Sequence, residues 1–224
     1  MSIASRERRA LADLLLERGP DAPTLCEGWT TKDLAVHLVV REYRPDAAAG
    51  MVVPRLAGHL DEVSRQVAAR GYADAVRLFR AGPPWWSPMA LLDPVVNLAE
   101  NIIHHEDVRR AGAGQTGPGV PGGEGSGVDA APPRDLPQHT RDAVWRVVRF
   151  AAPVFLSHAD ARVTLRRADP GRGPATRTAG RTGAADTVTV SGDAVELLLW
   201  LYGRDGAAQV VVDGPVERAT RTAI

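Results

Sequence analysis

The chain has 224 residues, of which 44% are hydrophobic and 24% charged, and its formal net charge at pH 7 is zero. This composition is ordinary for a globular protein that buries a sizeable core, and the balanced charge argues against a surface for nucleic acid or for acidic membranes. The single cysteine, Cys26, excludes an intramolecular disulfide and any metal site built from several cysteines.

The sequence gives no sign of a membrane segment or a targeting signal. It contains no apolar run of about 18 residues, which a transmembrane helix would need. Residues 1–8 also lack the apolar core of a signal peptide. We therefore expect a cytoplasmic protein without a membrane partner.

The first half of the chain has the apolar periodicity of helices. Thr30, followed by Asp33 three residues later, resembles a capping box at the start of a helix. Pro94 stands where a helix start tolerates a missing N–H group. We expect helices over residues 5–18, 30–44, 56–80 (interrupted at Gly71) and 94–110.

The second half changes character. Residues 112–134 are rich in Gly and Pro and predict a flexible linker. Beyond it the pattern predicts helices over 136–155 and 193–202, and strands over 162–167, 187–190 and 209–212. The predicted organisation is therefore a helical bundle over 1–111, the linker over 112–134, and a small α+β domain over 135–224.

A candidate metal site lies in the predicted helix over 94–110. Glu100 and His104 are four residues apart, so they lie one turn above each other, along an apolar stripe that includes Ile103. A buried carboxylate costs several kcal/mol unless it is paired or bound to a cation. A divalent ion would satisfy both side chains, although a hydrogen bond within the helix explains this pair equally well.

His37 is another side chain that can bind a metal and that lies on an apolar stripe, here on a different predicted helix. It shares a stripe with Leu34 and Leu38, where a plain bundle would place an aliphatic residue. Two imidazoles and one carboxylate, with a position left for water or substrate, form a common catalytic zinc set, and facing helices are the usual scaffold for metal sites in bundles. The pattern predicts zinc or another divalent ion at His37, Glu100 and His104, against a plain bundle with satisfied polar core residues.

Neighbouring residues could support this site. Asp107, three residues after His104, could orient its imidazole, or it could pair with Arg110 on the helix surface. His105 is rotated by about 100° from His104, so we expect it to lie beside the site rather than in it.

Three further residues have two interpretations each. Cys26 is expected to be a buried structural thiol rather than a nucleophile. Trp85 could line a substrate pocket or pack in the core with Trp86. Arg204 could bind a substrate carboxylate, or it could be a surface residue beside Asp205.

The candidate residues lie in segments that resemble a known family. Residues 24–38, T-L-C-E-G-W-T-T-K-D-L-A-V-H-L, and residues 100–107, E-N-I-I-H-H-E-D, are similar to motifs of the DinB-like superfamily, in the branch of mycothiol-dependent maleylpyruvate isomerase N-terminal domains. Residues 104–111, H-H-E-D-V-R-R-A, look most like a subfamily of actinobacterial metal-binding proteins. The resemblance covers residues 1–111, and residues 192–204 resemble a sterol-carrier-like domain more loosely.

The resemblance implies a four-helix bundle that binds one zinc ion through His37, Glu100 and His104. It further implies that the metal activates the thiol of a small cofactor, mycothiol, for attack on an electrophilic substrate, as an isomerase or an S-transferase. A non-catalytic module that binds a metal or a small molecule is the alternative. Either a monomer or a homodimer agrees with the sequence.

Overall fold

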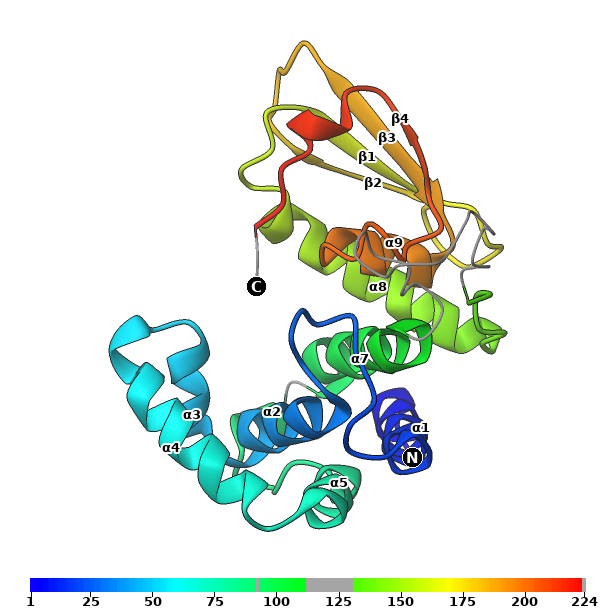
Figure 1. The fold of residues 1–224 in the computed structure, drawn as a ribbon. Coiled ribbons are helices and arrows are strands. Elements are labelled where there is room, and N and C mark those ends of the chain that lie inside the picture. Colours follow the sequence, from blue (N-terminus) through cyan, green and yellow to red (C-terminus); the bar gives the residue numbers. More distant parts are fainter. Residues whose placement is uncertain (92, 112–130, 223–224) are drawn as a thin grey trace, which may run out of the picture. The chain divides into compact units, whose positions relative to one another are not determined.

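The computed structural model describes residues 1–91, 93–111 and 131–222, which form two compact units, Met1–Ala131 and Pro132–Ile224. The described part of the first unit is helical, and the second unit combines helices with a sheet (Figure 1). The chain is therefore of mixed α and α+β class, as the sequence predicts. Residues 112–130 of the predicted linker lie outside the described residues. Within the described ranges, no helix is both long and apolar enough to cross a membrane.

The helices of the first unit surround one apolar core. Helix α1 packs against α5 and α7, and α2 packs against α4 and α5 (Figure 1). The core includes the fully buried Leu11, Leu34 and Phe79. The helices are α1 (Ile3–Arg18), α2 (Thr31–Tyr43), α3 (Pro45–Ala48), α4 (Ala57–Ala68), α5 (Tyr72–Ala81), α6 (Pro88–Leu91) and α7 (Leu98–Arg110), with 3-10 turns η1 (Ala49–Met51) and η2 (Pro54–Leu56) and a π-helical turn η3 (Asp93–Asn97).

Local signals in the sequence explain where these helices begin and end. The predicted capping box of α2 is confirmed, because Thr30 caps the backbone N–H of Asp33 while the Asp33 carboxylate accepts from the backbone N–H of Thr30 at 2.9 Å. Gly71 separates α4 from α5 with a φ of 91°, a conformation that disfavours side-chain-bearing residues. The predicted break at Gly71 is therefore confirmed.

The predicted helix over 94–110 differs from the observed one. Its first turn is the π-helical η3, and the regular α-helix α7 begins only at Leu98. A π turn adds one residue to a helical turn, and such turns are frequent at functional sites. Here it lies directly before the segment that carries Glu100 and His104.

The second unit is a four-stranded sheet with two helices on one face (Figure 1). The strand order is β2-β1-β3-β4, in which β1 and β3 are parallel and the other pairs are antiparallel. Helices α8 and α9 pack against each other, and α9 contacts β1 and β3. The elements are α8 (Gln138–Phe155), β1 (Arg162–Arg167), β2 (Thr176–Gly180), β3 (Thr187–Gly192), α9 (Ala194–Leu201), β4 (Val211–Asp213) and the 3-10 turn η5 (Val216–Arg218).

A buried ion pair ties this sheet to α9. Arg167, at the end of β1, pairs with Asp169, and both side chains are 2% exposed. The other carboxylate oxygen of Asp169 accepts a hydrogen bond from the backbone N–H of Ala194 at 2.8 Å, in the first turn of α9. Asp169 therefore satisfies one of the helix's initial donors as well as the buried guanidinium.

Candidate metal centre

Helices α2 and α7 bring the three predicted ligands together. One ligand atom each from His37, Glu100 and His104 lies within 4.8 Å of the other two. Nε2 of His104 lies 3.3 Å from Oε2 of Glu100, one helical turn away. The rings of His37 and His104 meet edge to face, with centroids 5.5 Å apart.

The sequence of α2 explains how His37 reaches this position. Its neighbours on the same stripe, Leu34 and Leu38, are buried in the core of the first unit. Their packing fixes the face of α2 that carries His37. Trp29 covers the ring from the residues before the helix, with centroids 5.1 Å apart.

Arg41 adds a positive charge at the edge of this group. It lies four residues after His37 on α2, and its Nε is 3.6 Å from Oε2 of Glu100. Its Nη1 donates to Oδ1 of Asn97 at 2.9 Å, and the amide nitrogen of Asn97 donates to the carbonyl oxygen of Met89 at 2.7 Å. Arg41 is therefore held between Glu100 and the π turn before α7.

Burial and charge give the three groups different protonation behaviour. Burial lowers the pKa of His37 to about 4, and the neighbouring charge of His104 adds to this effect. Burial alone would raise the pKa of Glu100, but the hydrogen bond from His104 and the charge of Arg41 outweigh it and lower that pKa to about 2. At neutral pH, His37 is therefore neutral and Glu100 is ionised, which are the states that bind a metal.

His104 is the hydrogen-bonding centre of the site. Its Nδ1 lies 2.9 Å from Oδ2 of Asp107, whose side chain is fully buried. Burial would lower the pKa of His104, but hydrogen bonds with Asp107, Cys26 and Glu100 outweigh burial and raise the pKa well above its usual value. Of the two interpretations of Asp107, the geometry favours the one in which it orients His104, while Arg110 donates to Glu106.

Cys26 lies beside this pair. Its thiol donates to Oδ2 of Asp107 at 3.2 Å, and Sγ is 4.0 Å from Nδ1 of His104. The side chain is only partly buried, so the expected burial of this thiol is wrong, while its structural role stays a prediction. Cys26, His104 and Asp107 form a second group whose donor atoms lie within 4.8 Å of one another.

One measured separation in the first group is compatible with a bound metal ion. Zinc–nitrogen and zinc–oxygen bonds of about 2.0–2.2 Å at tetrahedral angles place neighbouring donors roughly 3.3–3.6 Å apart. The 3.3 Å between His104 and Glu100 agrees with this spacing before any adjustment. The described residues thus contain groups that could hold a metal ion.

The remaining predicted residues lie elsewhere. His105 is buried on α7 next to His104, and it belongs to neither donor group found in the described part of the chain. Trp85 is 90% exposed and Trp86 53% exposed, so the interpretation that they pack in the core is wrong. Both follow Pro83 and Pro84 in a turn between α5 and α6, where no helix face directs them inward.

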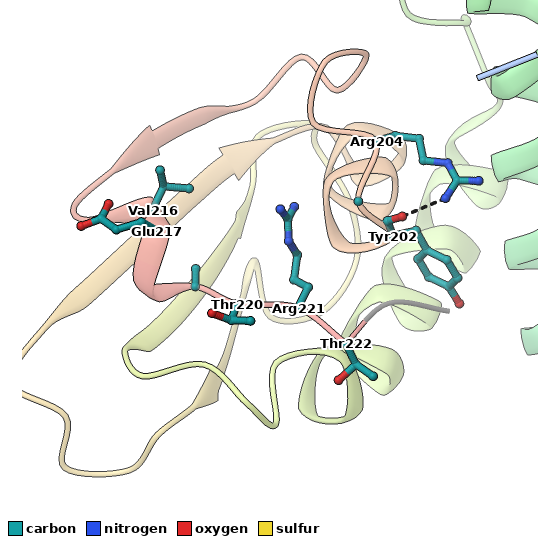
Figure 2. Close-up of a pocket in the computed structure, with 9 residues that line it drawn as sticks. Tyr202, Arg204, Val216, Glu217, Thr220, Arg221 and Thr222 are labelled. Atoms are coloured by element: carbon teal, nitrogen blue, oxygen red, sulfur yellow. Dashed lines mark hydrogen bonds between the residues drawn. The ribbon is translucent and has the colours of Figure 1, made fainter. Parts of the chain in front are cut away.

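Arg204 belongs to the second unit, where it lines a cavity of about 510 Å³ with Tyr202, Arg221 and Thr222 (Figure 2). Its Nη1 donates to the carbonyl oxygen of Tyr202 at 2.9 Å. Asp205, the partner considered for Arg204 in the sequence, forms two hydrogen bonds of 2.8 Å with Arg221. The role of Arg204 in binding a carboxylate stays a prediction.

Sequence reasoning missed Arg41, Asn97 and Cys26 as parts of the site. Arg41 carried a usable signal, because its spacing of four residues from His37 places it on the same face of a helix. Asn97 and Cys26 carried no such spacing signal. The position of Asn97 depends on the π turn, and that of Cys26 depends on the loop before α2.

Comparison of the chain with protein-family models, with curated proteins and with solved structures found no match.

Proposed function

We propose that the first unit binds one divalent metal ion, zinc, through His37, Glu100 and His104. The observation that carries this proposal is the convergence of the three donors from α2 and α7 within 4.8 Å. Three protein donors leave at least one position of a four-coordinate ion for a small molecule, whereas structural zinc sites are normally closed by four protein ligands.

The surroundings of the donors support this assignment, provided that the bound ion displaces the extra proton that the raised pKa of His104 gives it in the metal-free protein. His37 would offer a lone pair at neutral pH, because burial lowers its pKa to about 4. Asp107 accepts a hydrogen bond from the ring nitrogen of His104 that faces away from Glu100. A carboxylate in this position is the usual partner of a zinc-bound histidine, and it fixes both the tautomer and the orientation of the ring.

The activity we propose is a thiol-dependent isomerisation or S-transfer on a small electrophilic substrate, with mycothiol as the thiol. This part rests on the resemblance of residues 24–38 and 100–107 to the DinB-like superfamily, including its maleylpyruvate isomerase branch. A bound zinc ion would supply the chemistry that such a reaction needs, because it promotes loss of the proton from a coordinated thiol.

The chain's own residues support the donors and line the edge of the proposed site. Trp29, beside His37, provides an aromatic surface at the edge of the site. The hydrogen bond from His104, with a smaller contribution from the charge of Arg41, keeps Glu100 ionised, and Asp107 holds the ring of His104 in place. We assign none of these residues a proton-transfer step.

The activity is tested by incubating the zinc-loaded full chain with mycothiol and a panel of small electrophiles. We expect loss of the free thiol that depends on both zinc and protein, and that is abolished in His37→Ala. Arg18→Ala, on the exposed end of α1, serves as the control variant. Zinc binding without any thiol reaction across the panel would contradict the enzyme and leave the non-catalytic metal-binding module as the function.

A further inference from the structure

The two ring nitrogens of His104 face two different groups of donors. Nε2 faces Glu100 at 3.3 Å, on the side of the proposed zinc site. Nδ1 faces Oδ2 of Asp107 at 2.9 Å and Sγ of Cys26 at 4.0 Å. Cys26, Asp107 and Nδ1 of His104 are called the thiol group below. Its third separation, from Sγ of Cys26 to Oδ2 of Asp107, is 3.2 Å.

These separations are close to those that a bound ion would require. A tetrahedral ion with a metal–sulfur bond of about 2.3 Å and metal–nitrogen or metal–oxygen bonds of about 2.0–2.2 Å places its donors roughly 3.3–3.6 Å apart. The observed separations of 2.9, 3.2 and 4.0 Å lie on both sides of this range. Movements of about half an ångström would bring all three donors to the spacing of a zinc-sized ion, and a larger soft ion would need a somewhat wider spacing.

The loop that carries Cys26 is anchored to α7 by its backbone. The N–H of Leu25 donates to the carbonyl oxygen of Asp107 at 3.1 Å, which places the next residue beside the Asp107 side chain. The N–H of Cys26 donates to Oγ1 of Thr24 at 3.2 Å, and Thr24 also lies 3.0 Å from the carbonyl oxygen of Trp29. The loop at Cys26 is thus held in position by the backbone contact with Asp107 and by the Thr24 hydroxyl.

The donor types favour a different kind of ion from the first group. A thiolate binds zinc and also softer ions such as Cd²⁺ and Cu⁺, whereas two imidazoles and a carboxylate suit zinc but include no soft donor. The thiol group also brings two donors that are anionic when they bind, the thiolate and the Asp107 carboxylate, so a dication would be neutralised. The first group has a single anionic donor, with Arg41 lying 3.6 Å from it.

We propose that Cys26, Asp107 and Nδ1 of His104 form a second cation site, selective for soft, thiophilic ions, and that it competes with the zinc site for His104. A neutral imidazole has one lone pair, on one of its two nitrogens. An ion on Nδ1 therefore leaves the proton on Nε2, which removes a ligand from the zinc site. The proposal shares a residue with the proposed function, but it does not depend on catalysis.

The test is a titration of the metal-free full chain with Cd²⁺, followed by the ultraviolet charge-transfer absorption between thiolate and Cd²⁺. We expect a band that saturates at one ion per chain in the wild type and in His37→Ala. We expect no band in Cys26→Ser, together with a Cd²⁺ affinity at least tenfold lower. In His104→Ala and Asp107→Ala we expect the band to require at least tenfold more Cd²⁺. No band in the wild type, or an unchanged titration in both His104→Ala and Asp107→Ala, would overturn the site.

Competition is measured by adding Cd²⁺ to the zinc-loaded protein and analysing both metals after removal of free ions. We expect Cd²⁺ to release zinc, so that the two together stay at one ion per chain, while a total of two ions per chain would overturn the competition. Circular dichroism of Cys26→Ser and Cys26→Ala checks that the fold is retained. A cysteine-dependent Cd²⁺ band in a protein that never binds zinc would reject the proposed function and retain this site. Zinc binding without that band would reject this second site and retain the proposed function.

Discussion

Nδ1 of His104 lies 2.9 Å from Oδ2 of Asp107, so the ring nitrogen that faces away from Glu100 is held by a fully buried carboxylate. This contact fixes the orientation of the imidazole and leaves Nε2 directed at the proposed zinc site. The same carboxylate accepts a hydrogen bond from Cys26, which links the loop before α2 to the site. Asp107 is therefore expected to support metal binding by orienting the ligand His104.

Asp107→Asn tests this role. The amide keeps the shape of the side chain but offers only one acceptor oxygen and no charge, so His104 becomes a poorer ligand. Loss of such a partner usually lowers metal affinity by about 10- to 100-fold. Competition against a chromophoric zinc chelator measures the affinity, and Asp61→Asn, on the exposed face of α4, is the matched control. Equal zinc affinity in Asp107→Asn and the wild type would show that the contact has no such role.

Arg41→Gln is expected to strengthen zinc binding. The guanidinium lies 3.6 Å from the Glu100 carboxylate, where it competes for that ligand and repels an incoming dication. Removing one charge at this range changes the affinity by on the order of tenfold. The same chelator competition measures it, and Arg41→Lys, which keeps the charge, should stay near the wild type. Weaker binding in Arg41→Gln would mean that Arg41 mainly holds Glu100 in place.

The metal-free protein should lose stability on both sides of neutral pH. One histidine causes the loss on the acid side, and another causes it on the alkaline side. The folded state lowers the pKa of His37 to about 4, so the unfolded state binds more protons as pH falls from about 6.5 to 4, and stability falls with it. The pKa of His104 is raised in the folded state, so its contribution is complete below about 6.5 and is lost as pH rises through the folded value.

Urea unfolding in the presence of a chelator, repeated across pH, measures these two effects. We expect His37→Gln to flatten the acid side of the profile and His104→Gln to flatten the alkaline side. Since the comparison uses the slope with pH, a uniform loss of stability in either variant does not affect it. If both variants kept the wild-type slopes of stability against pH, the lowered pKa of His37 and the raised pKa of His104 would be contradicted.

The capping box of α2 should contribute to the stability of the first unit. Thr30→Ala removes the side-chain acceptor for the N–H of Asp33, and loss of such a cap costs about 1 kcal/mol. Thr30→Ser keeps the hydroxyl and should lie close to the wild type in urea unfolding. An equal loss in both variants would point to packing of the threonine methyl group instead.

In the second unit, Asp169→Ala should be strongly destabilising. It leaves the buried Arg167 without this carboxylate and removes the acceptor for the N–H of Ala194. Breaking a buried ion pair by removing one partner costs about 3–5 kcal/mol, and the loss here should lie towards the lower end because Arg167 keeps its pair with Asp142 at 2.7 Å. Asp213→Ala, in β4, is a control at a surface position, and thermal unfolding of the two variants compares them. A melting temperature of Asp169→Ala that matches the control would contradict the role of the pair.

The sequence was most informative where local chemistry decides the structure. The capping box at Thr30, the break at Gly71 and strand β1 over Arg162–Arg167 all follow from nearby residues, and all three are confirmed. Strand β2 (Thr176–Gly180) was missed, because its Thr-Arg-Thr-Ala-Gly sequence lacks an apolar alternation and its pairing with β1 determines its structure.

The candidate site also has a part that the sequence predicts and a part that it does not. His37, Glu100 and His104 were identified from spacing on predicted helices, and the structure places their donor atoms together. The position of Cys26 could not be predicted, because it depends on a loop held to α7 by the hydrogen bond from Leu25 to Asp107. Long-range backbone contacts of this kind leave no periodic signal in a sequence.

Metal analysis of the full chain, purified without added metal, tests most directly whether His104 is the shared ligand of a bound divalent ion. We expect about one divalent ion per wild-type chain, as for a single mononuclear site, and less than a tenth of that in His104→Ala at the same purity. A metal-free wild type that also fails to take up zinc on dialysis, or an undiminished metal content in His104→Ala, would contradict this role of His104.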